Sequence, residues 1–247
     1  SNIVPWLTTR QLESYCDRIM VGFVDCRAHY KHPQKVVVTG TPVRGDFFAM
    51  TKEEAKQKLG IDDGRPHIVS FWGSLGAGTM NRAMAEFIAL ECAHEPFHHV
   101  HGVGSICWEQ MQGWLKERGA ESEKHPSVEV REYIYDMAVQ MRAADLVICR
   151  AGASTLSELT ALGVPAILVP SPNVTNHHQE KNANLLGEHG AALVLAEEGL
   201  DGKQLFAAAA GILKDEQKLA EMSKNMASLG VRDATERIYE CAMSLLK

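Results

Sequence analysis

Residues 67–93, HIVSFWGSLGAGTMNRAMAEFIALECA, decide the fold class because they contain a strand, a glycine loop and a helix in succession. The apolar run His67–Phe71 predicts a buried strand, and the spacing of apolar residues over 80–93 predicts a helix. The glycines of segment 73–78 allow the tight turn that joins them. A strand followed directly by a helix is the basic unit of a parallel sheet.

The same alternation continues toward the C-terminus. Further strands are predicted at 97–101, 128–130, 146–149, 165–169 and 191–195, with helices at 109–118, 137–144, 155–162 and 178–188 and a helical end over 202–247. The strands are continuous apolar runs, as burial on both faces requires. The sequence therefore predicts an α/β fold, a parallel sheet with helices on both faces.

The first 45 residues break this alternation. A helix is predicted over 8–20, followed by short strands at 21–24 and 35–39. A capping box at Thr51–Glu54 predicts the start of another helix, which Gly60 would end. Residues 1–45 are either an extra edge unit or the tail of a preceding domain with its linker, before a domain over 46–247.

Composition restricts the class of partner. Among 247 residues, 23% are charged and the net charge is −6, which disfavours nucleic acid as a ligand but leaves phosphate binding by backbone N–H groups open. The six cysteines form no C-x-x-C pair and the N-terminus lacks a signal-peptide pattern, so we expect reduced thiols and a cytoplasmic location. No apolar run has the length needed to cross a bilayer.

The loop Gly73–Gly78 is the first candidate binding element. Free N–H groups at the start of the following helix suit a phosphate, and the Ser74 hydroxyl adds a donor. A plain tight turn is the alternative interpretation. The spacing G-x-x-G-x-G does not fit the dinucleotide fingerprint, no Gly-Lys-Ser/Thr of a triphosphate loop follows, and Trp72 occupies the first position of a nucleophile elbow.

The segment Arg150–Glu158 is the second candidate binding element. It also joins a buried strand to a helix, so the stretch Ala153-Ser154-Thr155 would offer a second anion site at the same edge of the sheet. The Glu158 carboxylate, one turn later, can accept two hydrogen bonds from vicinal hydroxyls, as on a ribose. Alternatively, Glu158 completes a capping box with Ser154 or Thr155.

The polar segment 170–182 follows the next strand. Gln179 and Asn182 are three residues apart, share a helix face and suit sugar hydroxyls. A solvated loop with Asn176 as N-cap is the alternative. Because three polar loops converge at one edge of one sheet, together they predict a site for a nucleoside diphosphate sugar.

The histidines near residue 100 do not predict a metal site. His99 and His101 would share one face of their strand, but no carboxylate or cysteine at suitable spacing completes a ligand set. Likewise His177 and His178, adjacent on a helix, point apart.

At these residues the chain resembles the MurG family. The motifs that carry the resemblance are Thr39–Arg44, the loop from Gly73 to Ala77, Arg150–Glu158, Ala161–Pro170, His178–Ala183 and the initial Asn2–Thr8. The resemblance spans nearly the whole chain. It implies the C-terminal, donor-binding half of a GT-B glycosyltransferase, Rossmann-like in fold, with residues 1–45 as the tail of the N-terminal acceptor domain and linker.

The resemblance also implies an activity: inverting transfer of N-acetylglucosamine from UDP-GlcNAc to the muramyl 4-hydroxyl of lipid I, giving lipid II in peptidoglycan synthesis at the cytoplasmic face of the cell membrane. It implies no metal and no other cofactor. The acceptor site and the base would belong to the N-terminal domain, so no catalytic residue is expected in this chain. For the nucleotide, the resemblance implies that the Ile134 backbone, with Met137 nearby, contacts uracil and that Glu158 contacts the ribose. Ser74 would bind the diphosphate, and the helix start would bind phosphate through Ala153, Ser154, Thr155, Leu156 and Ser157. Gln179 would contact the sugar, and Arg44 and Asn2 would approach from the linker side.

Two departures from the family pattern stand at Thr41, usually Asn, and Trp72, usually Gly. Two other interpretations remain open: another UDP-sugar transferase or epimerase of the same architecture, which Gln179 and Asn182 would discriminate, or a non-catalytic module that binds UDP-sugars.

Overall fold

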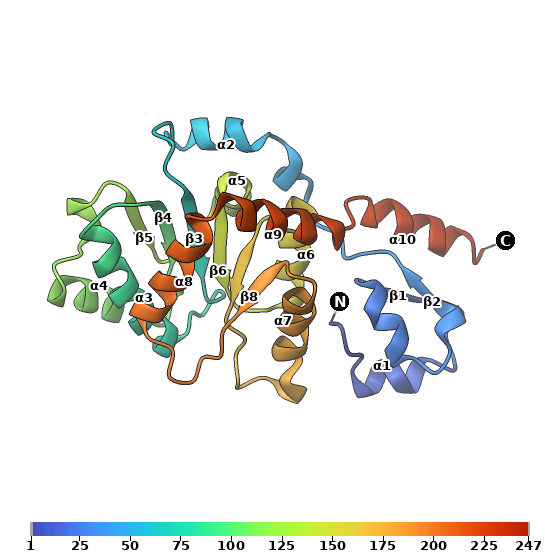
Figure 1. Ribbon diagram of the computed structural model, residues 1–247. Helices are drawn as coiled ribbons and strands as arrows, with labels where there is room; N and C mark the ends of the chain where they lie inside the picture. The colour runs from blue at the N-terminus through green and yellow to red at the C-terminus, as the bar shows by residue number, and fades with distance from the viewer. Residues whose placement is uncertain (1, 247) are drawn as a thin grey trace.

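The computed structural model describes residues 2–246, and its centre is a parallel sheet of six strands in the order β5-β4-β3-β6-β7-β8 (Figure 1). The strands are β3 (His67–Phe71), β4 (His98–Gly102), β5 (Val128–Arg131), β6 (Leu146–Cys149), β7 (Ala166–Leu168) and β8 (Ala192–Val194). The chain builds one half outward from β3 and then returns to add β6 on its other side. The resulting reversal between β3 and β6 is the place where doubly wound sheets bind ligands.

Helices cover both faces of this sheet, as the sequence predicted. The helices that follow residue 50 are α2 (Lys52–Lys58), α3 (Gly78–Cys92), α4 (Trp108–Glu117), α5 (Met137–Ala143), α6 (Ala153–Leu162), α7 (His178–Glu188), α8 (Gly202–Leu213) and α9 (Glu216–Ser228), and α10 (Ala234–Met243) lies away from the sheet. Alternate residues of each strand enter separate apolar cores: Ile68 and Ile148 pack with α3 and α8, while Val69 and Val147 pack with α5 and α6. The continuous apolar runs thus result from burial on both sides.

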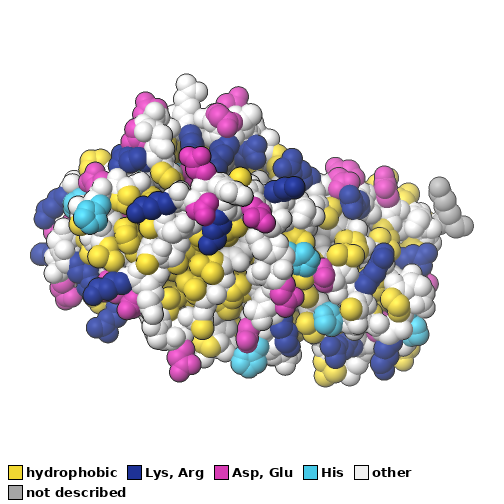
Figure 2. Space-filling view, viewed as in Figure 1, with side chains coloured by type: hydrophobic (Ala, Val, Ile, Leu, Met, Phe, Trp, Pro, Cys, Tyr) yellow, Lys and Arg dark blue, Asp and Glu magenta, His cyan; other side chains and the backbone are white. Residues whose placement is uncertain are grey.

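The surface in Figure 2 shows apolar side chains gathered over the middle of one face, around α8 and β8, with charged groups toward the margins. Within residues 2–246, no helix is long and apolar enough to cross a membrane.

The N-terminal segment differs from its predicted structure. The helix predicted over 8–20 is wrong in its second half: α1 covers only Leu7–Leu12, and Ile19–Val21 is strand β1. β1 pairs in parallel with β2 (Val36–Val38), forming a small separate sheet. Pairing with a strand distant in sequence outweighs the helical spacing of the apolar residues, and α1 itself buries no residue.

Gly40 connects the small sheet to the rest of the chain by close packing. Its φ of +77° lies in the left-handed region, and a Cβ at this position would lie 2.5 Å from Cβ of Val231. Val231 precedes α10, which extends along the side of the molecule that holds β1 and β2 (Figure 1). The final helix therefore lies beside the N-terminal segment rather than over the main sheet.

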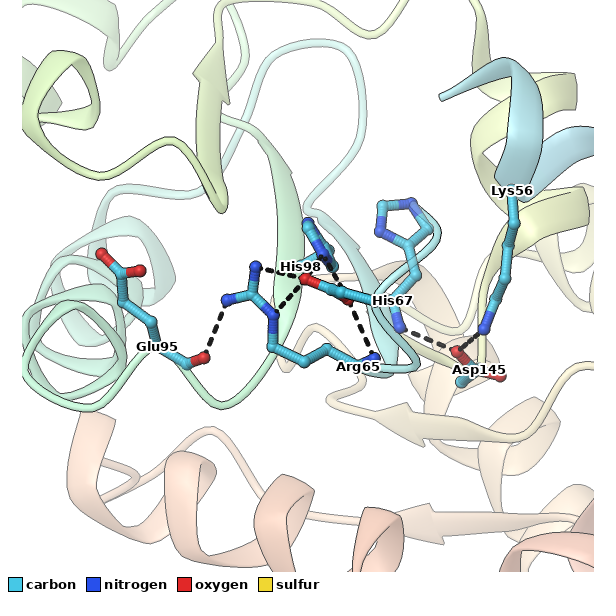
Figure 3. A network of polar contacts seen from close by, with 7 residues as sticks. Lys56, Arg65, His67, Glu95, His98 and Asp145 are labelled. Atoms are coloured by element: carbon cyan, nitrogen blue, oxygen red, sulfur yellow. Dashed lines mark hydrogen bonds and ion pairs between the residues drawn. The ribbon is translucent and has the colours of Figure 1, made fainter. Parts of the chain in front are cut away.

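A polar network closes the amino edge of the sheet, opposite the strand ends predicted to bind ligand (Figure 3). The Asp145 carboxylate accepts a hydrogen bond from the backbone N–H of His67 (2.8 Å) and forms ion pairs with Lys52 and Lys56, both 2.7 Å. Nearby, Arg65 donates to the carbonyl of Glu95 at 2.9 Å. Asp145 thus ties α2 to the beginnings of β3 and β6, and the predicted capping box at Thr51 starts α2.

Candidate functional site

A cavity of about 360 Å³ lies at the carboxyl edge of the sheet, beside the β3–β6 reversal. Its walls come from the loops after β3, β4 and β5, from α5 and α6, and from the segment that follows β2. The lining residues are Arg44, Phe47, Phe71, Gly73, Ser74, Gly102, Gly104, Glu132, Tyr133, Ile134, Met137 and Glu158. The fold therefore brings the predicted residues Arg44, Ser74, Ile134 and Glu158 together in one pocket of ligand size.

The glycine loop after β3 forms one wall and presents Ser74 to the cavity. Gly76 has a φ of +81°, and a Cβ there would lie 2.2 Å from the carbonyl oxygen of Val103. Gly104 has a φ of +85°, and its Cβ would lie 2.2 Å from the backbone nitrogen of Gly76. The two loops thus contact each other through their backbones, so the neighbouring loop leaves room only for glycine at position 76. From the sequence, the close approach indicated by these glycines had been an approach to a ligand.

Glu158 is partly buried on α6 and borders the cavity. Burial raises the pKa of its carboxyl group above the ordinary value, while the charge of Arg44 opposes that rise. No hydrogen bond or ion pair joins this carboxylate to any other residue between 2 and 246. The capping-box alternative is wrong, because the N-cap of α6 is Gly152 and no side chain caps the helix.

The start of α6 presents backbone donors, as predicted. The N–H of Leu156 is already bonded to the carbonyl of Gly152 at 3.0 Å, so the free donors are those that precede it, from Ala153 to Thr155. Leu156 itself is fully buried, and the Ser157 hydroxyl donates back to the carbonyl of Ala153 at 3.0 Å. Three of the predicted phosphate contacts, Ala153, Ser154 and Thr155, thus keep a free backbone N–H. The Leu156 N–H and the Ser157 hydroxyl are instead bonded within the helix.

Ile134 also lines the cavity. Its side chain is buried beneath the loop after β5, where its terminal carbons would meet a Cβ added to Gly102 at 3.2 Å. Throughout the described chain, no residue hydrogen-bonds to its backbone N–H or carbonyl. Met137, at the first position of α5, also lines the cavity. This wall therefore combines an apolar surface with a free backbone donor and acceptor.

Arg44 enters the cavity from the segment after β2. Its guanidinium lies 5.3 Å from the ring centroid of the buried Phe47 and 3.3 Å from the Asp46 carboxylate. The ion pair is largely exposed, which leaves Arg44 free to exchange Asp46 for an anionic ligand.

The third predicted loop does not line this cavity. The Gln179 carbonyl oxygen accepts from the Ser171 N–H at 2.9 Å, which leaves its NH₂ group as a donor. The expectation that Asn182 faces a sugar is wrong: its side chain is buried and bonds to the N–H of Ile3 (3.1 Å), the side chain of Asn2 (3.0 Å) and the carbonyl of Ala151 (3.2 Å). Asn2 is thus held at the carboxyl edge by α7.

The loop before α7 also differs from the alternative in which Asn176 is the N-cap of that helix. Asn176 and His177 both have positive φ, 58° and 49°, and His177 is the N-cap residue, without a side-chain cap bond. Asn176 therefore does not cap α7. Two consecutive residues in the left-handed region cost free energy that the surrounding packing must compensate.

Trp72, which departs from the family pattern, is buried and packs with α3. The Arg150 guanidinium lies 5.7 Å from its ring centroid, forms an ion pair with Glu197 at 2.7 Å and donates to the Val169 carbonyl at 3.0 Å. Thr79 donates its hydroxyl to the same Glu197. Arg150 is therefore held by contacts within the protein, and Trp72 packs beside it without lining the cavity.

Sequence reasoning missed several lining residues, notably Phe71, Glu132 and Tyr133. Tyr133 is half-exposed and packs against Tyr135 with tilted rings and a centroid separation of 5.0 Å. The only available signal was position: Phe71 is the last residue of a predicted strand, and Glu132 and Tyr133 come shortly after another, at the same edge as the named loops.

His99 and His101 share the buried face of β4 that packs on α3, as predicted. No group of three or more potential ligands in residues 2–246 has metal-binding geometry. All six cysteines are free thiols.

Comparisons with known proteins identify the family. Residues 67–238 match the model of the glycosyltransferase family 28 C-terminal domain. The chain is 42% identical over 246 residues to the UDP-N-acetylglucosamine–N-acetylmuramyl-(pentapeptide) pyrophosphoryl-undecaprenol N-acetylglucosamine transferase of Acetivibrio thermocellus, a match covering 100% of this chain and 65% of that protein. It is 33% identical to the protein of the same name from Bacillus subtilis, covering 66% of it.

Solved structures show the same architecture. MurG of Acinetobacter baumannii superposes with a TM-score of 0.73 at 25% identity, over 98% of this chain and 65% of that one. A UDP-GlcNAc 2-epimerase from Neisseria meningitidis, bound to UDP-GlcNAc, shares the fold at 14% identity and a TM-score of 0.64. The chain thus has the fold of the Rossmann-like C-terminal half of a GT-B protein and spans about 65% of the length of the curated relative from A. thermocellus.

Proposed function

Because the chain belongs to glycosyltransferase family 28 through its C-terminal domain, we propose that it is the UDP-GlcNAc-binding part of a hexosyltransferase. In this proposal residues 46–247 form the donor domain, and residues 1–45 belong to the end of an acceptor domain and its linker. The transferred N-acetylglucosamine goes to a lipid-linked muramyl-pentapeptide acceptor, as the names of the relatives state for those proteins.

The observation that carries the proposal is the pairing of Ile134 and Glu158 on one cavity. Uracil needs one backbone donor and one acceptor beside an apolar surface, and the free N–H and carbonyl of Ile134 supply them. Ribose needs an acceptor for two vicinal hydroxyls, and the otherwise unbonded Glu158 carboxylate supplies it. The two groups line a volume of about 360 Å³, which suits a nucleoside.

The diphosphate then lies between two sets of donors. Ser74 lines the cavity after β3, and the first N–H groups of α6 follow the neighbouring strand β6 at the same edge of the sheet, although Ala153, Ser154 and Thr155 do not line the cavity itself. Arg44 adds a cation from the linker segment. These donors stabilise the charge that develops on UDP as the acceptor hydroxyl attacks the anomeric carbon and the bond to the diphosphate breaks.

Gln179 contributes its NH₂ group to the sugar, and Asn2 approaches from the N-terminal side. The proposed setting is the cytoplasmic face of the cell membrane, where the donor nucleotide meets a lipid-linked acceptor. Nucleic acid is no partner in this proposal, and no cofactor takes part.

Isothermal titration calorimetry with UDP, UDP-GlcNAc and UDP-glucose tests the proposal. We expect UDP and UDP-GlcNAc to bind, and Glu158→Gln to weaken both by about tenfold, the cost of replacing a charged acceptor. Glu188→Gln, the same substitution at an exposed position near the end of α7, is the matched control. No binding of any uridine nucleotide would refute the proposal. Equal affinity for both sugars would leave a UDP-sugar site but remove the assignment to N-acetylglucosamine.

A further inference from the structure

Five buried polar side chains form a continuous hydrogen-bonded chain between the sheet and α3. All are at most 2% exposed, in a region otherwise filled by apolar groups such as Phe87. The chain runs, in order, through Glu91, His99, Ser70, His101 and Asn81, and ends at the backbone carbonyl of Val103. Unpaired polar groups cost free energy at this depth, so the direction of each hydrogen bond along the chain is physically constrained. Glu91 Oε1, at the end of the chain, has no partner within the described residues.

The Val103 carbonyl fixes the direction at one end. It can only accept, so the Asn81 Nδ2 at 2.9 Å donates to it, and the Asn81 Oδ1 consequently faces His101. That oxygen accepts from His101 Nε2 at 3.1 Å, so His101 carries a proton on Nε2. Burial lowers the pKa of His101 to about 3, which keeps the ring neutral and its Nδ1 an acceptor.

The remaining members follow from this start. The Ser70 hydroxyl, 2.7 Å from His101 Nδ1, donates to it and therefore accepts from His99 Nε2, also at 2.7 Å. His99 thus carries its own proton on Nε2. Its Nδ1 lies 2.7 Å from Glu91 Oε2, and one proton must lie between these two atoms. The Val103 carbonyl therefore sets the order of protons along the whole chain, because an Asn81 amide rotated by 180° would place its oxygen against that carbonyl oxygen.

Asn81 acts at the junction of two loops that line the proposed donor site. Its Nδ2 lies 3.2 Å from the position of a Cβ on Gly76, and its acceptor Val103 immediately precedes Gly104. The loops are joined further by hydrogen bonds from the Ser105 N–H to the Ser74 carbonyl at 3.3 Å and from the Ile106 N–H to Leu75 at 3.4 Å. Ser74, at the centre of this contact, is the residue proposed to bind diphosphate.

We propose that Asn81, hydrogen-bonded to His101 and to the Val103 carbonyl, is a positioning residue of the donor site that holds Ser74 and the glycine loop in place for the diphosphate. This proposal rests on the proposed function for its ligand. It assigns no contact between Asn81 and the donor, since the Asn81 side chain is fully buried and both its nitrogen and its oxygen are hydrogen-bonded within the protein. Its effect on binding is therefore indirect and specific to the phosphate side of the cavity.

The test compares UDP with uridine in Asn81→Leu, a neutral variant of similar volume, and in Asn184→Leu, the same change at an exposed asparagine of α7. We expect Asn81→Leu to weaken UDP by about tenfold or more and uridine by about twofold or less, with Asn184→Leu unchanged. Equal weakening of UDP and uridine, or UDP affinity within about twofold of the unmodified chain, would overturn the proposal.

Two further measurements keep the result decisive if Asn81→Leu folds poorly or the unmodified chain binds no UDP. Imidazole ¹⁵N shifts of the unmodified chain should show His101 protonated on Nε2 alone and His99 protonated at least on Nε2; a proton on Nδ1 of His101 overturns the proposed order. Amide exchange at Ser105 and Ile106 should accelerate in Asn81→Leu, and unchanged exchange would contradict the positioning role. Failure of UDP binding with accelerated exchange would refute only the proposed function.

Discussion

The contact between the loops after β3 and β4 makes a quantitative prediction for Gly104→Ala. Alanine at a φ of +85° carries the left-handed strain of about 1–2 kcal/mol that any L-residue has there. In addition, its Cβ would lie 2.2 Å from the Gly76 nitrogen and 2.5 Å from the Gly76 Cα, so the two backbones must separate. Such overpacking adds about 1–3 kcal/mol.

Gly119→Ala is the matched control, because Gly119 has a φ of +65° but no atom within 4 Å of its would-be Cβ. It lies just after α4 and is exposed. We expect urea unfolding to show a loss of about 1–2 kcal/mol for Gly119→Ala and about 2–5 kcal/mol for Gly104→Ala. We expect calorimetry to show weakened UDP binding only in Gly104→Ala, because its loop carries part of the cavity wall. Equal losses of stability in the two variants would refute the reasoning that the close approach, and not the backbone angle, makes glycine necessary.

Three further predictions follow from charged and titratable groups. Burial raises the pKa of Glu158, and its carboxylate is the proposed ribose acceptor, so UDP affinity should fall on acidification at a higher pH than for an ordinary glutamate. Glu158→Gln should abolish this pH dependence, and an identical pH profile in both proteins would contradict the role. Asp145→Asn should destabilise the fold by about 1–3 kcal/mol in urea while leaving UDP affinity unchanged, because Asp145 lies at the opposite edge of the sheet; altered affinity in the folded variant would argue against this separation. Burial lowers the pKa of His67 from about 6.5 to about 4, so between these pH values the unfolded chain binds more protons than the folded one. His67 should therefore contribute about 3 kcal/mol to the free energy of unfolding above pH 6.5, and this contribution is lost as the pH falls toward 4. His67→Gln should lose stability less steeply in that window, and an unchanged slope would exclude the assignment.

The sequence predicted the main sheet well because its strands are buried on both faces. The runs at 67–71 and 146–149 coincide with β3 and β6, since continuous apolar segments bounded by polar loops have few other structures available. The two elements of the small sheet were less well predicted. The residues of β1 fit a helical spacing, and only the pairing with β2, a non-local interaction, makes them a strand.

The sequence predicted which edge of the sheet holds the site, but not the contacts that its residues make. Parallel strands bring their carboxyl ends to one edge, so the loops holding Ser74 and Glu158 had to lie near each other. The role of Asn182 could not be predicted, because its position on α7 shows which way it points but not that Asn2 and Ile3 cover that face. Similarly, a glycine pattern shows that space is limited at Gly76 without showing that another loop limits it.

The small sheet shares its apolar core with the main sheet, and this has a mechanical consequence. Ile19 and Val36 lie in the same buried cluster as Val69, while Asn182 binds the backbone of Ile3 and Gly40 packs tightly against Val231. Because a movement of the small sheet away from this core would expose apolar surface to water, it would cost free energy. Arg44, a few residues beyond Gly40, therefore reaches the cavity from a segment that is anchored to the main body.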